Sequence, residues 1–249
     1  MNPTKPYKWF DYLPHDLRRR CYRTLAHDTY WSLIELRRNN PQSTYSLNGF
    51  NDRKCIFVHI PKCAGVSINK TLFNSLGGGH NSAMDYQIIY GRNVFKSYFK
   101  FTFSRNPWDR VFSAYNFLKK GGFDEIDKEW AETNLKEFDT FDKFVCEWIN
   151  TDNINTKNHF VPQHKYICNP RGKVIIDFIG RFENISSDFK KITGTLGIDL
   201  PLKHDNKTDT LKNNRYTEHY TTRSEKIISE VYKEDINLLG YRFNHDEQQ

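Results

Sequence analysis

Residues 55–67 read CIFVHIPKCAGVS, and this stretch decides the fold class. Its first four residues are all apolar, which is typical of a strand buried on both faces within a parallel sheet. Pro61 and Gly65 interrupt the apolar run, and the pattern then predicts a helix over Ser67–Leu76 that ends at the glycines 77–79. A strand, a tight loop with a lysine and a helix form an anion-binding arrangement, because the first amides of a helix have no partners within it.

The same alternation of strands and helices continues along the chain. Further apolar strands are expected at Phe99–Phe103 and Val174–Ile179. Further helices are expected at Trp108–Leu118, Phe138–Ile149, Ser187–Leu196 and Thr222–Leu239. This order indicates an α/β fold in which a central parallel sheet is flanked by helices on both faces.

The first fifty residues differ from the rest. Apolar residues from Leu17 to Leu36 fall near helical spacing beside basic ones, which predicts one N-terminal helix, and Asn39–Asn51 has the polar, turn-rich composition of a linker. We therefore expect residues 1–50 to form a helical extension packed on a domain of residues 51–249.

The composition limits the classes of function. Hydrophobic residues make up 37% of the chain and aromatic residues 15%, which is enough for a buried core and excludes global disorder. The formal net charge of +7 suits an anionic ligand, but the basic residues are spread along the chain with one short cluster at residues 18–20. That spread argues against a nucleic-acid partner. No apolar run approaches the ~18 residues of a membrane span, so no membrane span is expected.

The five cysteines are typical of a reducing compartment. They are odd in number and form no CxxC pair, which favours free thiols over a disulfide framework or a zinc site. A cytoplasmic location is the expectation, and a trimmed luminal domain is the alternative.

The loop after the first strand does not match the common nucleotide motifs. In a Walker A loop, GxxxxGK[ST], the lysine stands beside the hydroxyl residue, whereas Lys62 precedes Ser67 by five positions. The glycines 77–79 are not a dinucleotide motif either, because GxGxxG would need a glycine at Ser82. The identity of the bound anion must therefore be inferred from other residues.

Residues 59–67, HIPKCAGVS, resemble the 5′-phosphosulfate loop of the carbohydrate-type sulfotransferases, commonly HIPKTAGTS. The resemblance implies a P-loop-like sulfotransferase fold, 3′-phosphoadenosine-5′-phosphosulfate (PAPS) as sulfate donor, 3′-phosphoadenosine-5′-phosphate (PAP) as product, and no metal ion. Cys63 and Val66 replace two threonines, so the donor would depend more on backbone amides, Lys62 and Ser67. The residues implied to contact the 5′ end of the nucleotide are Pro61, Lys62, Cys63, Ala64, Gly65, Val66, Ser67 and Ile68.

A second anion site is expected at the next strand end. Residues 99–115, FKFTFSRNPWDRVFSAY, resemble the 3′-phosphate motif of the same family, in which Arg105 ends a strand and Ser113 lies on the following helix. The planar guanidinium of arginine can bind phosphate oxygens in a bidentate manner. Asp109 and Arg110 are interpreted as structural, Asp109 through the helix dipole. Two anion sites 43 residues apart, counted from Lys62 to Arg105, suit a nucleotide that is anionic at both ends.

His80 is the candidate base among nine histidines. Residues 80–86, HNSAMDY, resemble the family's histidine segment, and a histidine there is the proposed base of related uronyl-type enzymes. An imidazole exchanges protons near neutral pH, as removal of a hydroxyl proton requires. Lys62 would then hold the 5′-phosphate and neutralise the bridging oxygen of the leaving nucleotide. His59, at the strand end, is the alternative base.

Other residues have two open interpretations. His159 and His164 could line an acceptor pocket or be ordinary loop residues, and Arg181 could contact donor or acceptor. Lys207 lies in a segment that resembles a closing loop of the family and is a further candidate phosphate contact. Three aromatic residues could stack on a sugar ring or belong to the core: Tyr86, Trp130 and Trp148.

The sequence therefore predicts an O-sulfotransferase that moves a sulfuryl group by in-line displacement to the hydroxyl of a sugar or small metabolite. Two alternatives remain. One is a kinase-like phosphate-binding protein, disfavoured by the lack of a Ser or Thr after Lys62. The other is a non-catalytic basic module that binds an anion or a glycan. The oligomeric state and the acceptor stay open.

Overall fold

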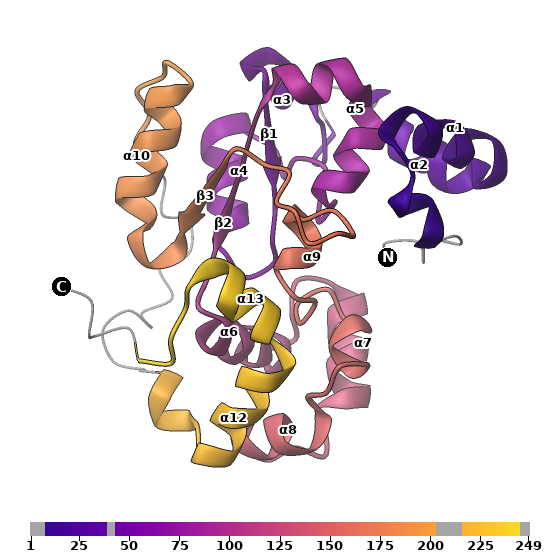
Figure 1. The fold of residues 1–249 in the computed structure, drawn as a ribbon. Coiled ribbons are helices and arrows are strands. Elements are labelled where there is room, and N and C mark those ends of the chain that lie inside the picture. The colour runs from indigo at the N-terminus through magenta and orange to yellow at the C-terminus, as the bar shows by residue number, and fades with distance from the viewer. Residues whose placement is uncertain (1–7, 39–42, 203–215, 245–249) are drawn as a thin grey trace. The chain divides into compact units, whose positions relative to one another are not determined.

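A computed structural model describes residues 8–38, 43–202 and 216–244 (Figure 1). The chain divides into two compact units, each described separately below. Unit 1 comprises Met1–Ser104 and Gln163–Asp205, and unit 2 comprises Arg105–Pro162 and Asn206–Gln249. The predicted division into an extension of residues 1–50 and a domain of residues 51–249 stays a prediction.

The centre of unit 1 is a three-stranded parallel sheet. Its strands are β1 (Cys55–Val58), β2 (Phe99–Ser104) and β3 (Phe178–Arg181), in the order β1-β2-β3. All four residues of β1 are buried. Because successive side chains of a strand point to opposite faces, this burial means that both faces of β1 are covered. The fold is α/β with a parallel sheet flanked by helices, as predicted.

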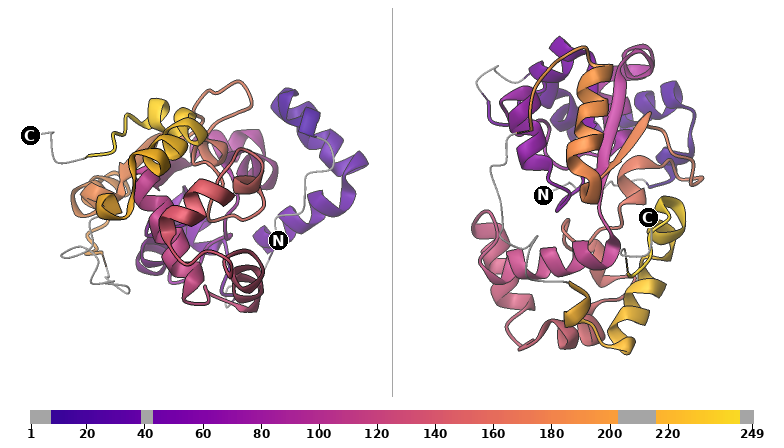
Figure 2. Two further views of the ribbon diagram at one scale, coloured as in Figure 1. Left: turned by 90° about the horizontal axis from the view of Figure 1, so that it is seen from below. Right: turned by 90° about the vertical axis from the view of Figure 1, so that its left-hand side faces the viewer.

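The third strand begins later than predicted. β3 starts at Phe178, four residues beyond the expected start at Val174. Val174 instead forms an isolated antiparallel bridge with Cys168. The helix α10 (Ile185–Thr195) follows β3 after a short turn, η3 (Phe182–Asn184), and packs on that strand; Figure 2 shows it alongside the sheet.

Two helices connect β1 to β2. The first, α4 (Gly65–Phe73), begins two residues before the predicted start and ends at Asn74, whose left-handed φ of 50° replaces the expected stop at the glycines 77–79. The second, α5 (Ala83–Ser97), was not predicted. It starts with a capping box in which the side chains of Ser82 and Asp85 each accept a hydrogen bond from the other residue's backbone amide.

The N-terminal region of unit 1 contains two helices instead of one. The chain leaves the helical conformation at Ala26, between α1 (His15–Leu25) and α2 (His27–Arg38), so the predicted single helix is wrong. Both helices pack against α5 (Figure 1). The remaining elements of the unit are η1 (Lys8–Tyr12), α3 (Asn48–Arg53) and α9 (His164–Ile167).

The regular elements in the described residues of unit 2 are all helices. Its elements are α6 (Pro107–Lys119), α7 (Glu125–Asn134), α8 (Phe141–Trp148), η2 (Asn153–Asn155), η4 (Tyr216–His219), α12 (Thr222–Val231) and α13 (Lys233–Leu239). The predicted helix over 222–239 is divided at Tyr232, whose hydroxyl donates to the carbonyl of Phe160 at 2.7 Å. No helix among the described residues of either unit is long and apolar enough to cross a membrane.

Two of the three aromatic residues left open by the sequence are buried in the cores. Trp148 is buried, and its ring lies 5.4 Å from that of Trp130 and 5.2 Å from that of Phe160, measured between ring centroids. Tyr86, in unit 1, is fully buried. The core interpretation therefore holds for Tyr86 and Trp148, whereas Trp130 is half-buried beside Trp148.

Candidate functional site

The loop between β1 and α4 is held in an uncommon backbone conformation. Lys62 has a φ of 70° and Ala64 a φ of 60°, in the left-handed region that residues with a β-carbon rarely adopt. Such a conformation costs on the order of 1–3 kcal/mol per residue and is concentrated at ligand-binding and active sites. Two strained residues within three positions therefore make this loop a candidate functional site on geometric grounds alone.

The loop ends in a helix N-terminus that no side chain caps. Ala64 occupies the N-cap position of α4 and has no side chain that could accept a hydrogen bond from the first turn. The first amides and the positive end of the helix dipole therefore face the loop. Lys62 adds an ammonium group before this turn and Ser67 a hydroxyl within it, which suits a phosphate.

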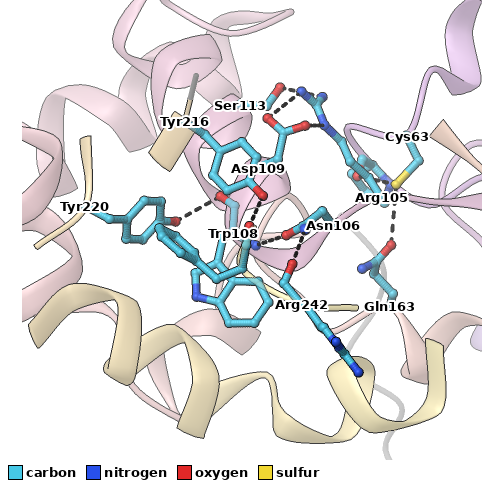
Figure 3. A network of polar contacts seen from close by, with 12 residues as sticks. Cys63, Arg105, Asn106, Trp108, Asp109, Ser113, Gln163, Tyr216, Tyr220 and Arg242 are labelled. Carbon is cyan, nitrogen blue, oxygen red and sulfur yellow. Dashed lines mark hydrogen bonds and ion pairs between the residues drawn. The ribbon is translucent and has the colours of Figure 1, made fainter. Parts of the chain in front are cut away.

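The expected contact residues of the loop divide into two sets by exposure. The side chains that remain partly exposed are those of Lys62, Ala64, Val66 and Ser67. The buried residues are Pro61, Cys63, Gly65 and Ile68. The thiol of Cys63 donates to the carbonyl of Pro61 at 3.7 Å and to Oε1 of Gln163 at 3.6 Å (Figure 3). Among the buried residues, Pro61 has no amide hydrogen, and the amides of Cys63 and Ile68 donate to the carbonyls of Ile60 at 3.3 Å and Ala64 at 3.2 Å.

His59 and His80 are in contact beside this loop. Their ring centroids are 4.4 Å apart, and Nδ1 of His80 lies 3.2 Å from the carbonyl oxygen of His59. His59 is buried at 7% exposure, whereas His80 is half-buried. A carbonyl only accepts hydrogen bonds, so this contact places the ring proton on Nδ1 and the lone pair on Nε2 of His80.

The ring of His59 lies against the α-carbon of Gly65. A β-carbon added at Gly65 would stand 1.8 Å from Cδ2 of His59, far inside any non-bonded contact. Gly65 is therefore required by the packing of His59, a role that the sequence alone did not reveal. His59 is enclosed by the helix start on one side and by His80 on another, as expected of a residue that positions its neighbours.

Gly65→Ala is expected to destabilise the chain by about 1–3 kcal/mol, because the added methyl group must displace the ring of His59. The urea midpoint should fall accordingly. The matched control is Gly194→Ala on α10, where an added β-carbon would meet nothing within 4 Å. There we expect a gain of about 0.5–1 kcal/mol from helix propensity. Equal midpoints for the two variants would contradict the assigned role of Gly65.

Arg105 and Ser113 come together in unit 2, as predicted for the second anion site. Nη1 of Arg105 donates to Oγ of Ser113 at 3.0 Å (Figure 3). Asp109 accepts two further bonds from the same guanidinium, from Nε at 2.7 Å and from Nη2 at 2.9 Å. Asp109 therefore orients Arg105, a role that its i,i+4 spacing could have indicated and that goes beyond the expected helix-dipole effect. Arg110 is fully buried.

The start of α6 is fixed by contacts that the sequence did not reveal. Oδ1 of Asn106 accepts from the amide of Trp108 at 3.1 Å, and its Nδ2 donates to the carbonyl of Arg242 at 2.8 Å (Figure 3). The hydroxyl of Tyr220 donates to the carbonyl of Trp108 at 2.8 Å. These contacts attach the C-terminal part of unit 2 to the helix that carries Ser113.

His159 is held by a buried carboxylate. Its Nε2 lies 3.3 Å from Asp127, and Nζ of Lys157 lies 2.6 Å from the same carboxylate. Although burial alone would raise it, the pKa of Asp127 is held well below its ordinary value by hydrogen bonds from His159, Lys157 and the amide of Phe123. His159 thus has a structural role, which favours the second of its two interpretations.

The remaining candidate residues are His164, Arg181 and Lys207. His164 begins α9, and the backbone amide of Arg181 donates to Asp188 at 2.8 Å. Lys207 lies outside the described residues. Within the described residues, no group of three His, Cys, Asp or Glu side chains is arranged to hold a metal ion.

The chain is similar in sequence to a known protein family and to two individual proteins. Residues 47–246 match the sequence model of the sulfotransferase family. An uncharacterised protein of Archaeoglobus fulgidus is 34% identical over 127 residues, which cover 51% of this chain and 88% of that protein. Carbohydrate sulfotransferase 14 of Danio rerio is 22% identical over 253 residues, which cover 88% of this chain and 67% of that protein. No solved structure matches the chain significantly.

Proposed function

Because the chain belongs to the sulfotransferase family, we propose that it transfers a sulfuryl group from PAPS to an acceptor hydroxyl and releases PAP. The observation that carries the proposal is the loop in which Lys62 and Ala64 adopt left-handed conformations before the uncapped start of α4. This loop presents backbone amides, an ammonium group and a hydroxyl to one anion, as the phosphosulfate end of the donor requires.

His80 is proposed to act as the base. The acceptor oxygen forms a bond to sulfur while the bond from sulfur to the bridging phosphate oxygen breaks, and the hydroxyl proton passes to Nε2 of His80. The contact between Nδ1 and the carbonyl of His59 supports this role, because it leaves Nε2 as the accepting nitrogen and fixes the ring.

Two basic residues are proposed to bind the donor. Lys62 neutralises the negative charge that develops on the bridging oxygen, which is where electrostatic stabilisation of the transition state is worth most. Arg105, oriented by Asp109 and bonded to Ser113, would bind the 3′-phosphate. Lys207 is retained as a further proposed contact.

The acceptor is proposed to be a sugar hydroxyl. The support is the relative from Danio rerio, which carries the name of a carbohydrate sulfotransferase. A small hydroxylated metabolite is the alternative. The odd number and spacing of the five cysteines favour the cytoplasm as the compartment.

Calorimetry with PAP tests the proposed function. We expect PAP to bind with a dissociation constant in the micromolar range, below 1 mM, without added metal, because both of its anionic ends have a proposed partner. ATP with magnesium, at the same concentration, is the comparison. A preference for ATP with magnesium would favour a kinase-like protein, and an absence of PAP binding below 1 mM would leave a non-catalytic anion-binding module.

A further inference from the structure

Unit 1 contains a cavity of about 280 Å³ away from the phosphate loop residues. Its walls come from three segments: residues 11–18 of the N-terminal region, the first turns of α5, and residues 169–175 after α9. The volume lies near the lower end of the range for small-molecule sites, about 300–1,000 Å³. The cavity therefore suits one small group, and its lining determines which.

Arg18 is the buried cation of this lining. Arg18 is only 3% exposed, yet its hydrogen-bond partners are neutral. Nη1 donates to Sδ of Met84 at 3.3 Å, and Nη2 donates to Oε1 of Gln87. Nε meets no acceptor, and no carboxylate among the described residues lies within ion-pair distance of this guanidinium. A buried charge without an anion is costly, so such groups are normally paired.

The electrostatics agree with a missing counterion. Burial lowers the pKa of the Arg18 guanidinium below its ordinary value, because surroundings of low polarity penalise the charged form. Asp11 and Asp85 oppose this effect without reversing it. An oxyanion inside the cavity would remove the penalty and would also supply an acceptor for Nε.

The other lining residues indicate what kind of molecule would carry the oxyanion. Arg171, an exposed residue, provides a second guanidinium in the lining, and Asp11 is the acidic residue there. Leu13, Met84 and Ile175 provide apolar surface. This combination fits an organic acid with an apolar side, such as a sugar acid, better than a free inorganic ion.

Two of the segments that line the cavity adjoin, along the chain, residues of the proposed transfer site. Met84 lies four residues after His80, at the start of α5. Residues 169–175 follow α9, which begins directly after Gln163, the residue that accepts a hydrogen bond from Cys63 of the phosphate loop. A ligand in the cavity would therefore contact segments that follow His80 and Gln163 directly in the sequence.

From this arrangement we propose that the cavity binds an acidic group, a carboxylate or a sulfate ester, of the acceptor through Arg18 and Arg171. The proposal rests on the proposed function, and it assigns a role to the N-terminal helices, because α1 supplies the buried cation that selects acidic acceptors. A neutral sugar would leave this cation without its anion and would bind more weakly.

The test compares acceptors that differ only in the acidic group. Calorimetry with p-nitrophenyl glucuronide, p-nitrophenyl glucoside 6-sulfate and p-nitrophenyl glucoside should show at least tenfold tighter binding of one or both acids than of the neutral glucoside. The same preference should appear as a lower KM for the acid in the transfer assay. Equal binding of all three would overturn the proposal.

Two variants and one control assign the preference to the cavity. In Arg18→Met, which keeps the length of the side chain without its charge, the preference for acids should disappear, and in Arg171→Ala it should fall severalfold. Arg20→Met, on the exposed side of α1, should keep it. Retention of the full preference by Arg18→Met would contradict the assignment.

Two further measurements separate the possible causes of failure. Thermal unfolding of Arg18→Met without ligand should occur at or above the wild-type temperature, because a buried unpaired charge has been removed; a marked fall would identify Arg18 as a structural residue and overturn the proposal. PAP binding, measured in the same proteins, reports on the proposed function alone. An acid preference that depends on Arg18 in a chain that binds no PAP would overturn the acceptor assignment.

Discussion

Lys62→Ala is expected to lower the turnover of sulfate transfer by a factor of about 10²–10³, the usual effect of removing one stabilising group from a developing oxyanion. The loop itself should persist. Alanine and lysine both carry a β-carbon, so the left-handed φ of 70° at position 62 is equally strained in both, and the contacts that impose it are unchanged. The loss should therefore reflect the ammonium group alone, measured as initial rates with labelled PAPS.

A control variant separates the specific effect of Lys62 from a general effect of losing a positive charge. Lys70→Ala removes a lysine from the exposed far end of the same helix, α4, and should leave turnover near that of the wild type. Circular dichroism should show that both variants are folded. A loss below tenfold in Lys62→Ala would contradict the role of Lys62 in neutralising the leaving nucleotide.

The fold could be predicted wherever an apolar run was bounded by turn residues. This was true of β1 and β2, whose extents agree with expectation to within one residue. It failed for β3, because the apolar run from Val174 begins in a segment that bridges back to Cys168 before the sheet is reached. Apolarity reports burial, and a buried extended segment need not belong to the sheet.

The predictions of the helices failed for a different reason. The break between α1 and α2 falls at Ala26, with neither a glycine nor a proline to signal it, so the spacing of apolar residues continued across the break. α5 was missed although Ser82 and Asp85 have the spacing of a capping box, a signal that was present in the sequence.

The residue types of the site were predictable, but only one of the contacts between them was. The pairing of Arg105 with Ser113 followed from their positions relative to a strand end and a helix turn. The packing of His59 on Gly65 and the buried cation at Arg18 depend on how distant segments meet in space, which a single sequence does not encode locally.

His80→Ala should lower turnover by a factor of about 10²–10⁴, the range that general base catalysis contributes. PAP affinity should be unchanged, because His80 is not proposed to contact the donor. The loss should also alter the pH profile: the low-pH decline that a histidine base produces, because a protonated ring cannot accept a proton, should be absent in the variant. His27→Ala, on the exposed surface of α2, is the matched control.

Rescue by added imidazole distinguishes a base from a structural residue. Removing the His80 ring leaves space beside His59, against whose ring it packs at 4.4 Å between centroids. Free imidazole can enter that space and accept the proton, so part of the lost rate should return in proportion to imidazole concentration. A ring that only supported the loop would give a loss of stability and of PAP affinity, without such rescue. Near-full turnover by His80→Ala would instead move the base to His59 or to a carboxylate, and since His59 is enclosed by Gly65 and its neighbours, the first of these would require the loop to open before transfer.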